Sequence, residues 1–208
     1  MRDFFELSSR IAGLQTARLV LREASPADAV PLFDATRNPE FNRLLVWPRP
    51  DRLEQVRQRM DAICLEHSRG RMCAVSACLK ETGAWVGLFR LMPYAAQPQI
   101  TEIGLWMHPD YWRASLATEI ARACIGAAFS LPEVHTVLAA TLPANKAALA
   151  AMAGFGFSFA GAVIRHHEDG HPVDVVEHSV DREVWSARQQ AASSAGKSVT
   201  PSGVRTSG

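Results

Sequence analysis

The sequence predicts the α/β (α+β) class, with a mixed, mostly antiparallel sheet flanked by helices. Its hydrophobic fraction of 48% is sufficient for a real core. Segments with two-residue apolar alternation are interspersed with segments whose apolar residues follow helical spacing. Short turns connect some of the predicted strands, whereas helices connect others. Turns join antiparallel strands and helical crossovers allow parallel ones, so both kinds of pairing are expected.

The first strand is expected at residues 16–22, where apolar and polar residues alternate. A helix should follow from Ser25 and Pro26, which suit the N-cap and the first helical position. Asp28 would close a capping box with Ser25. That helix should end before Pro39, because the residue preceding a proline avoids the helical region.

Residues 41–50 are expected to form a loop that carries Trp47 between prolines. Apolar residues at helical spacing then predict an amphipathic helix at 51–67. Two strands should follow, at 71–79 and 84–91, joined by a hairpin loop with a glycine near its end.

A central strand is expected to lead directly into a helix. Residues 101–108 alternate and are rich in β-branched and aromatic types, and Pro109 ends the ladder because it has no N–H. The helix begins near Leu116, so residues 112–115 form the connecting loop. Free N–H groups and the positive dipole end at a helix start can hold an anionic group.

The last predicted elements are a strand, a helix and a hairpin. The strand covers 134–142, and the helix covers 146–155 with Gly156 as its C-terminal stop. Strands at 159–166 and 173–184 should pair around an Asp-Gly turn. Trp185 is expected to be the final core residue.

The domain is expected to span residues 16–185, after a short N-terminal leader at 1–15. From Ser186 to Gly208 the chain is rich in Ala, Ser, Gly and Gln. It has few large apolar groups, so a flexible tail is expected there.

Composition narrows the range of partners. The net charge of +1 gives no electrostatic reason to expect nucleic acid, and no apolar run approaches the length that spans a membrane. The four cysteines form no CxxC pair and suggest reduced thiols in a cytoplasmic protein. A monomer or a homodimer is expected.

Three segments carry a resemblance to a known family. HPDYWRASLATEIARACIGAAF, residues 108–129, resembles motif A of the GNAT acetyltransferases. It is most similar to the branch that includes the ribosomal-protein N-terminal alanine acetyltransferases. PANKAALAAMAGFGF, residues 143–157, resembles motif B, and the first strand resembles the family's opening T-x-R-L-x-L-R. The resemblance covers residues 16–185 and implies a sheet whose fourth and fifth strands splay apart at one end.

The resemblance also implies that the loop wraps the pyrophosphate of acetyl-CoA, with no metal. The implied cofactor-binding residues come from the strand end, the loop and motif B: Met107, His108, Trp112, Arg113, Ala114, Ser115, Leu116, Ala117, Thr118 and Asn145. Arg113 and Ser115 occupy the positions of the family's two loop glycines, and Ala148 replaces a common serine. Arg113 can add a charge-assisted bond to a phosphate.

Glu102 is the first candidate for the base that deprotonates the amine, and the alternative is a solvated or salt-bridged strand residue. Histidine suits proton exchange near neutral pH, but His108 lies beside Pro109, where a structural role is favoured. Asn145 resembles the motif B asparagine that contacts cofactor or water, and the alternative is a helix N-cap. A backbone N–H near Met107 can serve as an oxyanion donor.

The expected function is acetyl-CoA-dependent N-acetyl transfer to a primary amine, either a protein N-terminus or a small molecule. The amine would attack directly in a ternary complex. The alternative is a non-catalytic acyl-CoA-binding or regulatory module, and another acyl donor such as succinyl-CoA also stays open. In related enzymes the loop 41–50 and the last hairpin border the acceptor pocket. The four histidines of that hairpin match no standard metal spacing: His166, His167, His171 and His178.

Overall fold

The computed structural model describes residues 4–45, 48–94, 97–166 and 170–197. The strands are β1 (Leu19–Glu23), β2 (Cys73–Leu79), β3 (Trp85–Tyr94), β4 (Gln97–Met107), β5 (Thr136–Thr141), β6 (Ser158–His166) and β7 (Pro172–Asp181). The helices are α1 (Phe5–Ile11), η1 (Pro26–Asp28), α2 (Ala29–Ala35), α3 (Pro39–Arg43), α4 (Leu53–Ser68), η2 (Pro109–Tyr111), α5 (Leu116–Phe129), α6 (Lys146–Phe155) and α7 (Arg182–Lys197).

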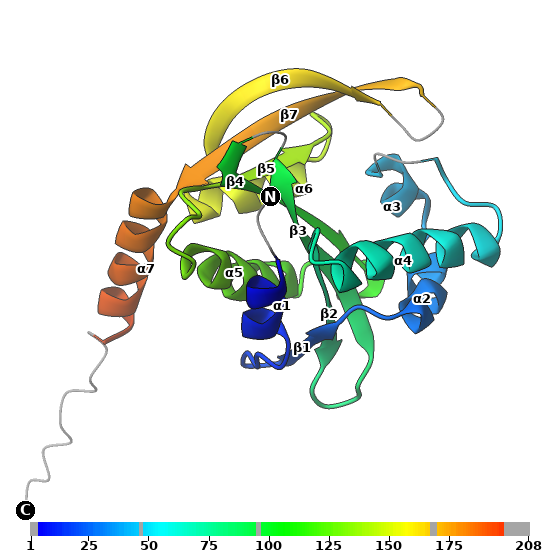
Figure 1. The fold of residues 1–208 in the computed structure, drawn as a ribbon, viewed down its shortest axis with the longest axis horizontal. Coiled ribbons are helices and arrows are strands. Elements are labelled where there is room, and N and C mark those ends of the chain that lie inside the picture. The colour runs from blue at the N-terminus through cyan, green and yellow to red at the C-terminus, as the bar shows by residue number, and fades with distance from the viewer. Residues whose placement is uncertain (1–3, 46–47, 95–96, 167–169, 198–208) are drawn as a thin grey trace, which may run out of the picture.

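The strands form one sheet in the order β1-β2-β3-β4-β5-β7-β6, with helices on both faces (Figure 1). All neighbouring strands pair antiparallel except β4 and β5, which are parallel. The prediction of a mixed, mostly antiparallel sheet is therefore confirmed.

The two central strands separate toward the C-terminal end of β4. Their register runs from the Ile100–Thr136 pair to the Ile103–Ala139 pair and ends there. β4 nevertheless continues to Met107 and remains paired with β3 from Thr101 to Met107. This confirms the expected splaying of the fourth and fifth strands.

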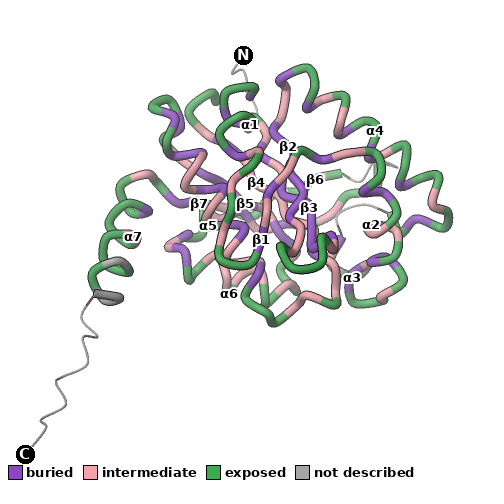
Figure 2. Tube along the Cα trace, turned by 90° about the horizontal axis from the view of Figure 1, so that it is seen from below, coloured by how far each residue is buried: buried purple, intermediate pink, exposed green. Residues whose placement is uncertain are grey.

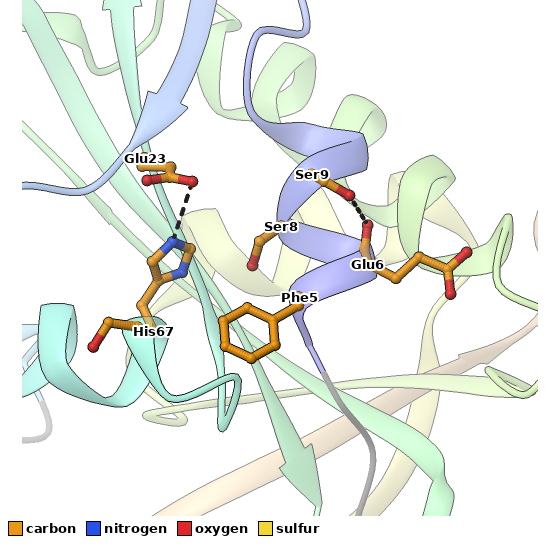
Figure 3. A pocket seen from close by; sticks show the side chains of 7 residues that line it. Phe5, Glu6, Ser8, Ser9, Glu23 and His67 are labelled. Carbon is orange, nitrogen blue, oxygen red and sulfur yellow. Dashed lines mark hydrogen bonds and ion pairs between the residues drawn. The ribbon is translucent and has the colours of Figure 1, made fainter.

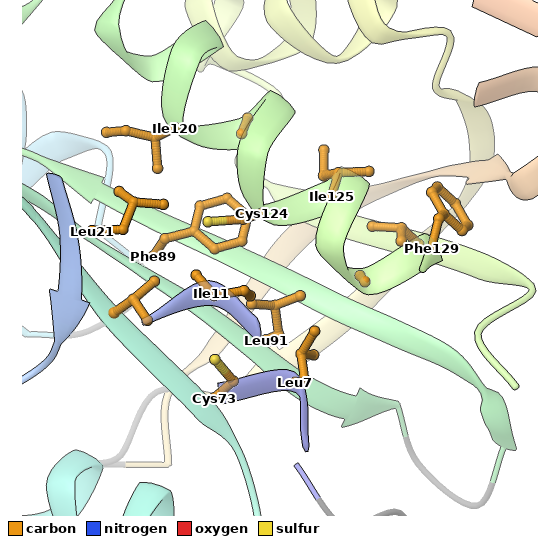
Figure 4. Packing of buried hydrophobic residues seen from close by; sticks show 14 of the residues in the cluster. Leu7, Ile11, Leu21, Cys73, Phe89, Leu91, Ile120, Cys124, Ile125 and Phe129 are labelled. Carbon is orange, nitrogen blue, oxygen red and sulfur yellow. The ribbon is translucent and has the colours of Figure 1, made fainter. Parts of the chain in front are cut away.

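Alternate residues of the sheet supply two cores. On one face, Phe89 and Leu91 of β3 pack with α1 and α5 in the larger cluster (Figure 4). On the other, Leu88 and Ala74 pack with α2 and α4. Adjacent strand positions thus point to opposite faces, as a pleated strand requires. Figure 2 shows the buried segments gathered in the central strands, with exposed outer turns on the surrounding helices.

The N-terminal segment differs from the expected leader, because it forms α1 and belongs to the core. Phe4, Leu7 and Ile11 recur on one face of the helix, and all three are completely buried. A stretch of only seven helical residues carries too weak a periodic signal to be assigned to the core from sequence.

The expected loop at 41–50 is also partly different, because α3 extends into it. Asn38 begins that helix by accepting a hydrogen bond from the Glu40 N–H at 2.9 Å. Pro39 occupies the first helical position, which it suits because no partner for its nitrogen is needed there. Trp47 lies outside the described residues.

The expected flexible tail at 186–208 instead continues as helix through Lys197, and residues 198–208 lie outside the described part of the chain. Arg182 fixes the helix start by donating to main-chain carbonyls at the end of α5, including that of Phe129. Trp185 packs at 5% exposure, which confirms it as a core residue. Alanine, glutamine and arginine then favour helix even where little surface is buried.

Asp28 is the centre of a buried polar network that joins β1, η1 and the sheet. Its side chain is 2% exposed and accepts two hydrogen bonds from Arg22, at 2.5 and 3.0 Å. The carboxylate also accepts from the Ser25 N–H and the Ser76 hydroxyl, and Ser76 in turn accepts from the Trp85 indole. The predicted capping box is therefore present, and it is extended by tertiary contacts.

We expect Asp28→Asn to lower the free energy of unfolding by about 2 kcal/mol, because the amide cannot accept all the hydrogen bonds that the buried carboxylate receives from Arg22, Ser25 and Ser76. Urea denaturation at neutral pH measures this loss. Asp61→Asn, at an exposed position of α4, should change stability by less than about 0.5 kcal/mol. Equal stability of the two variants would contradict a structural role for the network.

Candidate cofactor and acceptor site

The loop between β4 and α5 adopts a backbone that normally requires glycine. Arg113 has φ of 65° and Ser115 has φ of 58°, both in the left-handed region. An L-residue in this region costs roughly 1–2 kcal/mol, whereas glycine does not. These are the two loop positions at which the resembled motif has glycine. The loop therefore has a backbone conformation suited to glycine, although its residues at these positions are arginine and serine.

The start of α5 presents N–H groups toward this loop. Among the described residues, Ser115 makes no side-chain cap hydrogen bond at the N-cap position. The side chain of Leu116 is 3% exposed and belongs to the core, so this residue can contact a ligand only through its backbone. Ala117 and Thr118 are partly exposed in the same first turn. Uncapped N–H groups and the helix dipole make this end suitable for an anion.

The end of β4 directs one backbone N–H into the opening between the strands. His108 donates its N–H to the Val86 carbonyl of β3 at 2.9 Å. Residues alternate in bonding direction along an antiparallel ladder, so the N–H of Met107 points away from β3 toward β5. The β4–β5 register has already ended at Ile103. The Met107 carbonyl is held by the Trp112 indole N–H at 3.1 Å.

His108 makes contacts that favour the structural alternative. Its Nδ1 accepts from the Asp110 N–H at 3.3 Å and thereby caps η2. Its Nε2 lies 3.4 Å from a carboxylate oxygen of Asp34 on α2. The side chain is 12% exposed. His108 thus links the loop between β4 and α5 to the helical layer that contains α2.

Glu102 lies in an ion-paired cluster, on the face of β4 that it shares by alternation with Trp106. Its Oε1 accepts from Arg165 at 2.5 Å, and the same guanidinium donates to Glu177 at 2.8 Å. The Tyr94 hydroxyl donates to Glu177 at 3.0 Å. The β6–β7 hairpin curves over one side of the molecule, which brings Arg165 to β4 (Figure 1). Glu102 is therefore salt-bridged, as the alternative proposed, and it lies on the strand that opens.

The cluster shifts the pKa values of two of its members. Burial favours the neutral form of Arg165, but hydrogen bonds to Glu102 and Glu177 outweigh it and raise the pKa of the guanidinium. Burial, and then the hydrogen bond to Glu177, raise the pKa of Tyr94. Both groups consequently keep their protons throughout the neutral range.

Asn145 lies on the other side of the opening. β4 and β5 run parallel, so the loop after β4 and the turn after β5 lie at the same edge of the sheet. Asn145 starts α6 by accepting from the Ala148 N–H at 3.1 Å, which is the N-cap alternative. Its amide N–H₂ group is not needed for that cap and can serve a second role.

Arg18 and Glu119 support the loop, and the sequence analysis did not single them out. Arg18 donates to the Ala114 carbonyl and to the Glu119 carboxylate. Glu119 also accepts from the Arg18 N–H at 2.8 Å and from the Thr16 hydroxyl. Thr16 and Arg18 belong to the family's opening motif, which is the one signal that pointed to them.

A hollow of about 550 Å³ lies between α1 and the end of α4, away from the opening between β4 and β5 (Figure 3). Its lining includes Ser8, Glu23 and His67. His67 accepts from the Ala74 N–H at 3.1 Å, and its other nitrogen lies 3.8 Å from Glu23. These contacts tie the end of α4 to the sheet, so the histidine has a structural role.

Within the described residues, no group of three or more His, Cys, Asp or Glu side chains could hold a metal ion. His167 of the histidine-rich hairpin lies outside that part of the chain. None of the described helices combines the length and the apolar character that crossing a membrane requires.

The family is decided by a match that covers most of the chain. Residues 18–158 match the model of the acetyltransferase (GNAT) domain. The chain belongs to the GNAT acetyltransferase family. The predicted resemblance and the prediction of an acyltransferase are both confirmed at this level.

Individual GNAT relatives agree with this assignment. The uncharacterized N-acetyltransferase YoaA of Bacillus subtilis is 23% identical over 168 residues, which is 80% of this chain and 95% of YoaA. A putative ribosomal-protein-serine acetyltransferase from Vibrio cholerae superposes with a TM-score of 0.71 at 18% identity, covering 87% and 99% of the two chains. RimJ of Mycobacterium smegmatis, solved with a CoA disulfide, gives 0.68 at 20% identity, covering 84% and 89%.

We expect Ser115→Gly to stabilise this GNAT domain by about 0.5–1 kcal/mol, because glycine adopts the observed left-handed backbone without strain. Thermal denaturation measures the gain. Ser115→Ala keeps the β-carbon and should show no such gain. Equal stability of the glycine and alanine variants would contradict the inferred strain.

Glu119 should make stability fall in acid. Burial alone would raise its pKa, but hydrogen bonds from Thr16 and Arg18 outweigh burial and lower it below the usual value of 4.5. The contribution is therefore complete above that value and is lost as pH falls through the lower pKa of the folded state. The stability gap between wild type and Glu119→Gln should stay constant from about pH 7 to about pH 5 and narrow from there to about pH 3. A constant gap would contradict the prediction.

Proposed function

We propose that this protein is an acetyl-CoA-dependent N-acetyltransferase whose acceptor is a primary amine. The observation that carries the proposal is the loop before α5. Arg113 and Ser115 keep the glycine-type conformation there despite their side chains. A loop that had lost its ligand would have little reason to keep two strained residues. The neighbouring RimJ structure, which holds a CoA disulfide, supports the choice of ligand.

In this proposal the backbone N–H groups of residues 113–118 hold the diphosphate, and Arg113 adds its charge. The thiol arm lies between β4 and β5, where its amide groups pair with open strand edges. The Met107 N–H donates to the thioester carbonyl and strengthens that bond as the oxygen becomes negative. One such donor contributes about 3 kcal/mol in comparable sites.

The amine attacks the thioester carbonyl directly, without a covalent enzyme intermediate. Glu102 takes the proton from the ammonium form, either directly or through a water molecule. The hydrogen bond from Arg165 orients the Glu102 carboxylate on the face of β4 that receives the acceptor. The tetrahedral intermediate then collapses: the C–S bond breaks, and the extra proton on the attacking nitrogen passes to the departing thiolate or to water, which leaves the neutral amide and CoA. Asn145 contacts the cofactor or an ordered water from the opposite side of the opening.

The acceptor is proposed to be a protein N-terminus or a small-molecule amine. The similarity to a ribosomal-protein-serine acetyltransferase supports the first class. The β6–β7 hairpin and α3 are the elements proposed to border the acceptor pocket. We also propose a cytoplasmic protein whose catalytic unit spans residues 16–185, buttressed by α1.

One observation favours a second candidate, a non-catalytic acyl-CoA-binding module. Glu102 already has an ion-pair partner in Arg165 at 2.5 Å, and a paired carboxylate is a less available base. A thiol-release assay with acetyl-CoA and a panel of amines distinguishes the two candidates. Amine-dependent release supports the enzyme, whereas CoA binding without turnover on any amine supports the module.

We expect Glu102→Gln to lower kcat/KM by about 100-fold, the usual range for loss of a general base. The dissociation constant for CoA should stay within about twofold, because Glu102 is remote from the diphosphate loop. The thiol-release assay and titration calorimetry measure the two quantities. Glu81→Gln, in the exposed β2–β3 turn, is the matched control. Unchanged turnover in Glu102→Gln would remove it as the base.

A further inference from the structure

One arginine joins the cofactor loop to the helix behind it. Arg18 lies just before β1, and its Nη1 donates to the Ala114 carbonyl at 2.8 Å. Its Nε and Nη2 contact one carboxylate oxygen of Glu119 at 2.9 and 2.8 Å. Ala114 lies between the two left-handed residues, so the guanidinium binds the middle of the strained segment.

The bond to Ala114 sets the direction of the next N–H. The peptide unit that joins Ala114 and Ser115 is planar and trans, so its C=O and N–H point in opposite directions. Arg18 holds the carbonyl toward β1 and α5. The Ser115 N–H is consequently directed away from the guanidinium and stays available to a ligand of the loop.

The contact with Glu119 balances charge at the same place. A carboxylate in the first turn of α5 would repel a diphosphate that binds at the helix N-terminus. Two hydrogen bonds from the Arg18 side chain and main chain, together with the one from Thr16, occupy that carboxylate and lower its pKa against the effect of burial. The site therefore keeps Glu119 as an anchor without leaving its charge unpaired.

We propose that Arg18 is the positioning residue of the cofactor loop, holding by side-chain contacts the conformation that glycines would otherwise make accessible. Arg18 acts through the Ala114–Ser115 peptide and does not itself contact the thioester. This inference rests on the proposed binding of acetyl-CoA at this loop. It explains how Arg113 and Ser115 can occupy left-handed positions in a working site.

The test compares CoA with pantetheine, which has the thiol arm but no diphosphate. Arg18→Met should raise the dissociation constant for CoA about tenfold, the loss typical of one charge-assisted hydrogen bond. Binding of pantetheine, followed by NMR titration, should change by less than about twofold, since its contacts lie along the strands. Arg57→Met removes an exposed arginine paired with Glu54 on α4 and should leave both values unchanged.

A rescue experiment separates positioning from general stability. Adding Ser115→Gly to Arg18→Met should restore CoA affinity to within about threefold of wild type, because glycine needs no clamp to reach the left-handed region. If Arg18→Met does not fold, Arg18→Lys and Glu119→Gln provide milder losses of the same contacts. They should weaken CoA binding in the same direction.

Three outcomes are informative. Equal CoA affinity in wild type and Arg18→Met would overturn the positioning role. Equal loss of CoA and pantetheine binding would also overturn it, because the effect would not then depend on the diphosphate. Absence of CoA binding by the wild-type protein would overturn the proposed function itself, whatever the Arg18 variants do.

Discussion

The candidate site depends on the fact that pairing between β4 and β5 stops at Ile103, four residues before β4 ends. A full-length parallel pair would occupy the Met107 N–H and leave no gap for an extended ligand, since strand neighbours lie only about 4.8 Å apart. β3 keeps β4 extended through this region. β3 and β4 approach each other closely at Gly87, where an added β-carbon would lie 2.5 Å from the Trp106 carbonyl oxygen. The opening therefore lies between β4, which stays paired with β3 through Met107, and β5, which departs after Ala139.

Long-range charge pairs complete both ends of this opening. At the loop end, Arg18 joins Ala114 to Glu119. At the acceptor end, Arg165 joins Glu102 to Glu177 across three strands of the sheet. Each arginine has several partners, which lowers the cost of holding charge in a partly buried place. In the proposed enzyme the two clusters have different roles: the Arg18 cluster shapes the backbone that would meet the diphosphate, and the Arg165 cluster orients the carboxylate that would meet the amine.

Local chemistry made much of the fold predictable. The capping box at Asp28, the N-cap at Asn145 and the left-handed stop at Gly156 each depend on neighbours within a few residues, and all three are present. The start of α5 at Leu116 was predicted for the same reason. The short helices α1 and α3 and the extended α7 were not. Their stability comes from burial or from distant carbonyls, which local periodicity does not report.

The sequence by itself determined the order of the seven strands and of helices α2, α4, α5 and α6, the position of the loop before α5, and the resemblance to the family. Its motif residues act on their immediate backbone, so their spacing along the chain is sufficient to identify them. Only the tertiary structure decided that Glu102 is ion-paired, and that Arg18 grips the loop. These partners are 63 and 96 residues apart in the chain. Contacts at such separations follow from how the sheet curves and packs, and no local propensity encodes that.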